Sequence, residues 1–345
     1  MTFNELRKDY LLNRWVIITT ERAKRPTDFA TKRAESGEGK ICPFCPGNEK
    51  LTPPATLLYV KAGHGVKKDR DFDGKRRSDW RIRVIPNLYP ALRPPNKDEI
   101  RNLSGPYERM SAIGLHEVVV ESPNHNEHPG VANIEQLKLT FEAIRDRVET
   151  ISTYDYVKYV SIFRNHGKEA GASLSHAHSQ IIATPMVPKL ILDELDASAR
   201  FNKEKKGCAF CSIIEKESHS PRLIYQNSHF TAFASWAGIH PFEFWMIPQK
   251  HQSSILDISR NQIEALAKAV HSCFGALKKI LNDPPYCFTF HIAPTCGKYN
   301  FYHWHIEVYP SLSVFAGFEK GTGIYINTVI PEKAALSLRR AILKL

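Results

Sequence analysis

Two short cysteine motifs of identical spacing stand out among the residues that can do chemistry. Cys42 and Cys45 enclose two residues, and so do Cys208 and Cys211. A Cys-x-x-Cys pair on a tight turn supplies two of the four ligands that a tetrahedral zinc ion takes. The chain has 7 cysteines, and an odd number without a secretion signal argues against a framework of disulfide bonds. Each pair therefore predicts a metal site, and a pair of reduced thiols is the alternative.

Histidines at matched spacing complete both sets. The separation between the two histidines of the first set differs by one residue from that in the second set. The expected ligands are Cys42, Cys45, His125 and His176 in the first set, and Cys208, Cys211, His251 and His303 in the second. A site closed by four protein ligands is structural rather than catalytic. We expect two structural zinc sites, and the sequence leaves open whether the second metal is zinc or iron.

A second chemical pattern begins beside the first set, at His178 and Gln180. Alternate residues of a strand face the same side, so His176, His178 and Gln180 should point to one site. A neutral imidazole can attack phosphorus and then pass the phosphoryl group on. The amide of Gln180 can donate a hydrogen bond to a phosphate oxygen but cannot activate water. We predict His178 as a nucleophile assisted by Gln180, and a core histidine bonded to a backbone carbonyl is the alternative.

Weaker signals surround this pattern. Residues 167–175 are small and polar, so their backbone amides could cradle phosphate oxygens beside His178. Arg22 and Arg25 could clamp a pyrophosphate, although a solvated basic turn explains them equally well. His305 occupies the place of His178 in the second half. We interpret the second-half copy as degenerate.

The elements that must position these residues occur twice in the same order. After each Cys-x-x-Cys come a strand, a histidine, a helix, a second strand and a His-x-His strand, which indicates an internal duplication. Apolar residues at steps of three and four predict helices over 134–151 and 263–280, with Asn133 and Ser259 as N-caps. The fold class is therefore α+β, with antiparallel sheets that each pack one helix and that can join edge to edge. We predict halves at 1–190 and 207–345, linked by residues 185–206.

Composition limits the partners. Lys and Arg number 47 against 36 Asp and Glu, which gives a net charge of +11 and favours anionic partners. No helix-turn-helix, RNP or zinc-finger pattern accompanies this charge, so we expect no nucleic-acid partner. The N-terminus lacks an apolar signal segment, and no apolar run is long enough to cross a bilayer. We expect a cytoplasmic protein with no membrane partner.

Over nearly its whole length the chain resembles the galactose-1-phosphate uridylyltransferase family, within the histidine-triad superfamily. The resemblance rests on residues 22–26, 42–45, 87–92, 121–125, 165–180 and 317–319. It implies two tandem histidine-triad-like halves and a double displacement through a nucleotidyl-His178 intermediate, with Gln180 steadying the transferred group. By matching motifs it also implies substrate contacts: Arg22 and Arg25 to the diphosphate, Asn87 to the nucleoside, Asn165, Gly171 and Ser173 to phosphate, and Glu319 to sugar hydroxyls.

The chain departs from the best-known branch of that family. That branch has a Lys before its Gly-aromatic-Glu segment and a Gln after it, where this chain has Ser313 and Tyr325. The segment 317–327 is more similar to a branch that includes plant ADP-glucose phosphorylases. The first expectation is a uridylyltransferase that uses UDP-glucose and galactose 1-phosphate, and the alternative is an ADP-glucose phosphorylase or related adenylyltransferase.

Two further alternatives remain at this point. One is a non-catalytic zinc or nucleotide-binding protein, and the other is a hydrolase of nucleotide conjugates. Gln180 disfavours the hydrolase, because a triad hydrolase has a third histidine at that place. The family also implies a homodimer with its active site near the subunit boundary.

Overall fold

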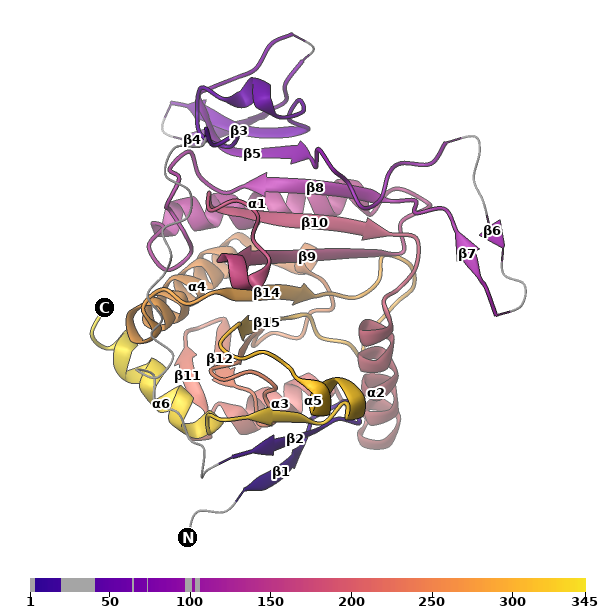
Figure 1. Cartoon of the computed structure of the whole chain (residues 1–345), viewed down its shortest axis with the longest axis vertical. Coiled ribbons are helices and arrows are strands. Elements are labelled where there is room, and N and C mark those ends of the chain that lie inside the picture. The colour runs from indigo at the N-terminus through magenta and orange to yellow at the C-terminus, as the bar shows by residue number, and fades with distance from the viewer. Residues whose placement is uncertain (1–3, 20–40, 64, 73, 97–100, 103–105) are drawn as a thin grey trace.

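The computed structural model describes residues 4–19, 41–63, 65–72, 74–96, 101–102 and 106–345 (Figure 1). The candidate residues Arg22 and Arg25 lie outside these ranges. Within them, no helix combines the length and the apolar character needed to span a membrane.

One antiparallel sheet of 11 strands runs through the described chain, in the order β11-β12-β13-β15-β14-β9-β10-β8-β5-β3-β4 (Figure 1). The first half contributes β3 (Leu57–Ala62), β4 (Gly65–Asp69), β5 (Trp80–Pro86), β8 (Leu115–Val120), β9 (Tyr159–His166) and β10 (His178–Thr184). The second half contributes β11 (Leu223–Gln226), β12 (Phe230–Ala234), β13 (Phe244–Pro248), β14 (Tyr286–His291) and β15 (His305–Pro310). The halves meet where β9 pairs antiparallel with β14, which confirms that their sheets join edge to edge.

The strand order repeats outward from this joint, as the duplicated sequence predicted. One half reads β9, β10, β8, β5 and the other β14, β15, β13, β12. Helix α1 (Ile134–Ile151) follows β8, and helix α4 (Arg260–Leu281) follows β13. The two helices pack against each other on one face of the sheet (Figure 1). The α+β class with one packed helix in each half is therefore confirmed.

Both helices begin where the sequence predicted. The Asn133 side chain accepts a hydrogen bond from the Gln136 N–H, and Ser259 forms a full capping box with Gln262. These caps satisfy amide groups that the first helical turn leaves without partners. They fix the point at which the chain leaves the sheet and turns back over it.

The two faces of the first half are covered by different parts of the chain. On the helix face, Val119 and Ile181 belong to the core cluster that includes the apolar residues of α1. On the opposite face, Val118 and Val120 pack with Phe44, which belongs to the loop that carries the first cysteine pair. Because side chains alternate along a strand, His178 and Gln180 lie on this second face, away from α1.

The remaining elements surround the sheet. A second, three-stranded sheet contains β1 (Glu5–Lys8), β2 (Trp15–Ile18) and β16 (Tyr325–Asn327), with β16 parallel to β2. The other elements are β6 (Arg101–Asn102), β7 (Arg109–Met110), α2 (Lys189–Lys205), α3 (Ala209–Glu217), α5 (Gly317–Thr322) and α6 (Pro331–Ile342). Most of the expected connector is thus helix α2, and Pro331 opens the terminal helix as predicted. The division into halves at 1–190 and 207–345 stays a prediction.

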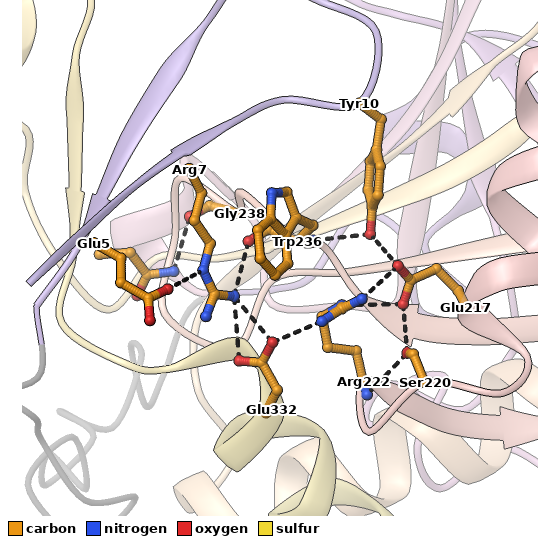
Figure 2. Close-up of polar contacts among 10 residues, drawn as sticks. Glu5, Arg7, Tyr10, Glu217, Ser220, Arg222, Trp236, Gly238 and Glu332 are labelled. Atoms are coloured by element: carbon orange, nitrogen blue, oxygen red, sulfur yellow. Dashed lines mark hydrogen bonds and ion pairs between the residues drawn. The ribbon is translucent and has the colours of Figure 1, made fainter.

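A cluster of ion pairs fastens the N-terminal strands to the second half (Figure 2). The guanidinium groups of Arg7 and Arg222 lie 4.0 and 4.9 Å from the ring centroid of Trp236. Both arginines bind Glu332 of α6, at N–O distances of 3.0 and 2.7 Å. Arg222 also binds Glu217 of α3 at 2.8 Å. The cluster therefore joins β1, α3, α6 and the loop after β12.

Removing the carboxylate of Glu332 should destabilise the fold, because it leaves two largely buried guanidinium groups without their shared partner. Their side chains are 7% and 14% exposed, while that of Glu332 is 23% exposed. We expect Glu332→Gln to lower the free energy of unfolding by roughly 1–3 kcal/mol, below the cost for a fully buried pair. Urea denaturation measures the change. Glu215→Gln alters an exposed glutamate of α3 and serves as the control, and equal small effects of both variants would contradict a stabilising cluster.

Glu243, just before β13, is a buried acid with a raised pKa. Its Oε2 accepts hydrogen bonds from the N–H groups of Ile239 and His240 at 2.7 and 3.1 Å. Its Oε1 is buried without a hydrogen-bond partner in the described chain. Burial raises the pKa of this carboxyl to about 8; the nearby Glu307 adds to the rise, and Arg14 opposes it.

This buried acid predicts a pH dependence of stability. The folded-state pKa lies above the ordinary value of 4.5. The stability that the protonated carboxyl contributes to the folded state is therefore complete below pH 4.5 and is lost as the pH rises through 8. The limiting slope is about 1.4 kcal/mol per pH unit. We expect Glu243→Gln, which carries no titrating proton, to lose less stability than the native chain between pH 5 and pH 8.5. Thermal unfolding midpoints at both pH values measure this, and an equal loss in the two proteins would refute it.

Candidate active site and metal centres

The first predicted metal set comes together at one end of the first half. The cysteine pair lies in the loop before β3, His125 follows β8, and His176 precedes β10. Cys45 Sγ lies 3.3 Å from His125 Nδ1 and 3.6 Å from His176 Nδ1, and Cys42 Sγ lies 3.6 Å from His176 Nδ1. The four ligand atoms all lie within 4.8 Å of one another, which is the compactness that a tetrahedral ion requires.

The hydrogen bonds behind these histidines leave the right atoms for a metal. His176 Nε2 lies 2.9 Å from the carbonyl oxygen of Ser122, and a carbonyl can only accept, so Nε2 carries the proton. Nδ1 then presents its lone pair to the thiols. His125 Nε2 lies 2.8 Å from the hydroxyl of Ser175. Outer hydrogen bonds of this kind orient zinc-binding histidines in proteins, and burial lowers the pKa of His176 to about 4, so the ring is neutral.

The second predicted set also comes together. Cys211 Sγ lies 3.5 Å from His251 Nδ1 and 3.6 Å from His303 Nδ1, and Cys208 completes a group within 4.8 Å. His251 Nε2 donates to the carbonyl oxygen of Asn300 at 2.8 Å. His303 Nε2 is buried without a hydrogen-bond partner in the described chain. Thiol and imidazole donors in this arrangement fit zinc at both sites.

His178 is the first residue of β10, and its ring is fixed through one nitrogen. Its Nδ1 lies 2.7 Å from the carbonyl oxygen of His176. Nδ1 must therefore carry the proton, which leaves the lone pair on Nε2. Nε2 has no hydrogen bond to any residue that the structure describes. Burial lowers the pKa of His178, which keeps the imidazole neutral and nucleophilic.

The surroundings of His178 also restrict its movement. Its ring lies 5.4 Å from that of Phe44, which sits between the two cysteines of the first metal set. Behind the strand, Arg164 NH1 donates to the His178 carbonyl at 3.1 Å. Arg164 also pairs with Glu121, which accepts from the Ser179 hydroxyl at 2.5 Å. This buried ion pair holds the strand that carries His178.

Arg164 and Glu121 were not among the site residues predicted from the sequence. The sequence does show them as charged residues at the ends of otherwise apolar strands. A charged side chain that is buried there requires a partner of opposite charge. Their pairing depends on strand register, which the sequence alone does not give.

Gln180 and Asn87, both predicted as site residues, lie on the same face of the sheet as His178. Both side chains contact His116. Gln180 Oε1 lies 2.8 Å from His116 Nε2, and Asn87 Nδ2 lies 3.0 Å from the same atom. His116 belongs to β8 and was also missed in the sequence analysis. The structure therefore gathers His178, Gln180 and Asn87 on one face of β5, β8 and β10.

The other predicted residues fall into two groups. Asn165 and Gly171 are close together, since a Cβ on Gly171 would lie 3.5 Å from Asn165 Nδ2. Gly171 has φ +83°, which favours glycine, and it ends the short helix Lys168–Ala170 on the way to the exposed Ser173. Glu319 lies on α5, beside β16 and well apart from β10 (Figure 1). One copy of the chain therefore does not bring Glu319 to His178.

The second-half counterpart of His178 is enclosed. His305 is fully buried, its Nε2 lies 3.3 Å from Glu307 Oε1, and its ring stacks 5.2 Å from that of Trp245. Glu194 and His291 complete a buried group around it and bind each other at 2.8 Å. Neither residue was predicted at this place from the sequence. Both nitrogens of His305 are engaged inside the core, so it offers no open atom to a substrate.

Several known proteins are similar to this chain over most of its length. A family model described as a domain of unknown function (DUF4921) matches residues 127–344. The ADP-glucose phosphorylase of Arabidopsis thaliana is 35% identical over 97% of this chain and 92% of that protein. The galactose-1-phosphate uridylyltransferase of Thermotoga maritima is 30% identical over 97% of this chain and 98% of its own length.

Two solved structures have a similar fold over nearly the whole chain. A crystal structure of an ADP-glucose phosphorylase from Arabidopsis thaliana with bound ADP-glucose superposes with a TM-score of 0.79 and 32% identity, over 98% of this chain and 99% of that one. A uridylyltransferase structure superposes with a TM-score of 0.75 and 27% identity, over 99% of both chains. The likeness therefore covers the whole fold.

Proposed function

This chain belongs to the galactose-1-phosphate uridylyltransferase family, and we propose that it is a nucleotidyltransferase that works by double displacement on His178. The observation that carries the proposal is the state of the imidazole. The bond from Nδ1 to the His176 carbonyl leaves the Nε2 lone pair without a partner among the described residues. His176, two residues before His178, belongs to the first Cys2His2 set. A metal ion bound there would hold the backbone beside His178 in place.

In the first step, His178 Nε2 attacks the α-phosphorus of a nucleotide sugar. The Nε2–P bond forms as the bond from phosphorus to the sugar phosphate oxygen breaks, and the sugar 1-phosphate leaves. Because Nδ1 keeps its proton, the nucleotidylated ring is positively charged, and the His176 carbonyl 2.7 Å away stabilises that charge. In the second step, a phosphate oxygen of the acceptor attacks the same phosphorus, and the neutral imidazole leaves.

Neighbouring residues take the roles that the family implies. Gln180 donates to a non-bridging oxygen of the transferred phosphoryl group, and Asn87 contacts the nucleoside. Asn165, Gly171 and Ser173 contact the phosphate side. Arg22 and Arg25, outside the described residues, are proposed diphosphate contacts, and Glu319 is a proposed sugar contact that a second copy of the chain would supply in a homodimer.

Zinc is the proposed resident metal of both Cys2His2 sets. Bound there, it supplies structural cross-links and offers no open position to substrate. In the first set it would tie the loop that carries Phe44 to His176, and so keep Phe44 against His178. A cytoplasmic location is proposed from the sequence alone.

The first candidate reaction is the exchange of UDP-glucose and galactose 1-phosphate for glucose 1-phosphate and UDP-galactose. ADP-glucose phosphorolysis is the second candidate, and the 35% identity to a plant ADP-glucose phosphorylase favours it. Both reactions use the same nucleotidyl-His178 step. They differ in the base of the donor and in whether the acceptor is a sugar phosphate or free phosphate.

One experiment separates these candidates. The protein is mixed with UDP-glucose or ADP-glucose, each with galactose 1-phosphate, with phosphate, or with neither, and glucose 1-phosphate is measured. Sustained release that requires UDP-glucose and galactose 1-phosphate supports the first candidate, whereas a requirement for ADP-glucose and phosphate supports the second. Release without either acceptor at the full rate would indicate hydrolysis and contradict both.

A further inference from the structure

A glutamine can assist phosphoryl transfer only when its side-chain amide has the correct one of two orientations. Its side-chain amide carries an acceptor and a donor of nearly equal size, and a half-turn about the last bond exchanges them. Only the NH2 group of Gln180 can stabilise a phosphate oxygen, since the carbonyl oxygen would repel it. The residue that decides the orientation therefore matters for the proposed reaction.

His116 is placed to decide it. His116 belongs to β8, two residues before Val118, and Val118 pairs with Gln180 of β10. Because alternate residues of a strand share a face, His116 and Gln180 lie on the same face of the sheet. The backbone N–H of Ala91 donates to His116 Nδ1 at 3.2 Å. A backbone donor cannot reverse its role, so Nδ1 holds the lone pair. In a neutral imidazole the proton then sits on Nε2.

This tautomer fixes the amide of Gln180. The Nε2–H of His116 donates to Gln180 Oε1 at 2.8 Å, so the NH2 group turns away from His116. No residue in the described ranges bonds to that NH2 group. The rotated amide would place two donors against each other, which is unfavourable in a half-buried site.

The same tautomer also affects Asn87. Its Oδ1 accepts from the Tyr89 N–H at 2.9 Å, which fixes that amide too. Its Nδ2 lies 3.0 Å from His116 Nε2, so this tautomer also sets two donors against each other, and an acceptor atom of a ligand bound at both N–H groups would offset their repulsion. The N–H groups of both amides therefore remain for a ligand.

We propose that His116 is a positioning residue that holds the Gln180 amide with its N–H donors directed at the phosphoryl group on His178. This inference rests on the proposed function, because it concerns the transfer step. His116 itself touches neither substrate nor the reacting atoms. It acts through Gln180, and its loss should lower the rate of transfer while leaving substrate affinity nearly unchanged.

Two amide substitutions form a matched pair for the test. In His116→Gln, the amide nitrogen takes the place of Nε2 and can still donate to Gln180. In His116→Asn, the shorter amide takes the place of Nδ1 and can still accept from Ala91, but it does not reach Gln180. Both variants keep a polar side chain, and thermal unfolding verifies that both fold.

The readout is the single-turnover rate of nucleotidylation by the nucleotide sugar that the native protein uses. We expect His116→Asn to slow it roughly 10- to 100-fold, the scale for misplacing a reacting group by about 1 Å. His116→Gln should retain most of the rate, and KM should change less than about threefold in both. In a Gln180→Ala background, His116→Asn should cause no further loss, because its effect passes through Gln180.

Equal rates for the two variants, or a loss from His116→Asn that is undiminished in the Gln180→Ala background, would overturn the role of His116. If His116→Asn does not fold, His116→Ala, alone and combined with Gln180→Ala, tests the same coupling; if His116→Gln does not fold, His116→Asn in both backgrounds still tests it. Failure of the proposed function looks different, because the native protein itself would then form no nucleotidyl adduct.

Discussion

His178→Gly should abolish the nucleotidyl adduct and reduce turnover by roughly 10⁴-fold or more, the scale for removing a covalent nucleophile. The physical reason is that no other described imidazole near Gln180 has an open nitrogen: His116 has both nitrogens in hydrogen bonds. Steady-state release of glucose 1-phosphate measures the loss. The variant should remain folded, since it keeps all four residues of the first Cys2His2 set.

The control for this variant is the second-half counterpart. His305→Gln changes a histidine at the same place in the repeat, but its nitrogens are bonded to His303 and Glu307 inside the core. It should retain adduct formation at temperatures below its unfolding midpoint. Turnover that survives in His178→Gly and disappears in His305→Gln would place the reaction in the other half.

Loss of the first metal should be the second large effect. Cys42→Ala removes one of four ligands, so we expect bound zinc to fall from about two ions per chain to about one, with a loss of several kcal/mol of folding free energy. The loop that carries the cysteines packs through Phe44 on the sheet face where His178 of β10 lies, so activity should fall as well. Metal analysis and urea denaturation of protein purified without chelator measure both changes.

A cysteine outside both sets provides the matched control. Cys296 is exposed, and Cys296→Ala should change neither the metal content nor the stability beyond about 0.5 kcal/mol. Two zinc ions retained in Cys42→Ala, or native protein with no tightly bound metal, would contradict the structural zinc site.

The parts of this molecule that sequence could predict are those encoded by local spacing. The two ligand sets follow from motif spacing, the caps at Asn133 and Ser259 follow from local hydrogen bonding, and the edge-to-edge joint follows from the repeat. His116 could not be found in this way. Its contact with Gln180 depends on the register of β8 against β10 and on a backbone amide at Ala91, which no local pattern records.

Two other features also required the structure. The connector after Pro188 forms α2, because its buried residues, including Ile191 and Leu195, find a core to cover, whereas its charges alone indicated a linker. Glu319 lies on α5, beside β16 of the three-stranded sheet, whereas His178 lies on β10 of the 11-stranded sheet, and the sequence alone did not indicate this separation. Tertiary pairing, not local preference, determines both.

The measurement that tests the account most directly is the mass of the intact protein after incubation with UDP-glucose or ADP-glucose and no acceptor. The account predicts one nucleoside monophosphate per chain from one of these donors, in an acid-labile and base-stable linkage that peptide mapping places on His178. Adding the acceptor should remove the mass and release the product. An adduct on His305 or any other residue, or turnover by a protein that never forms an adduct, would contradict the account.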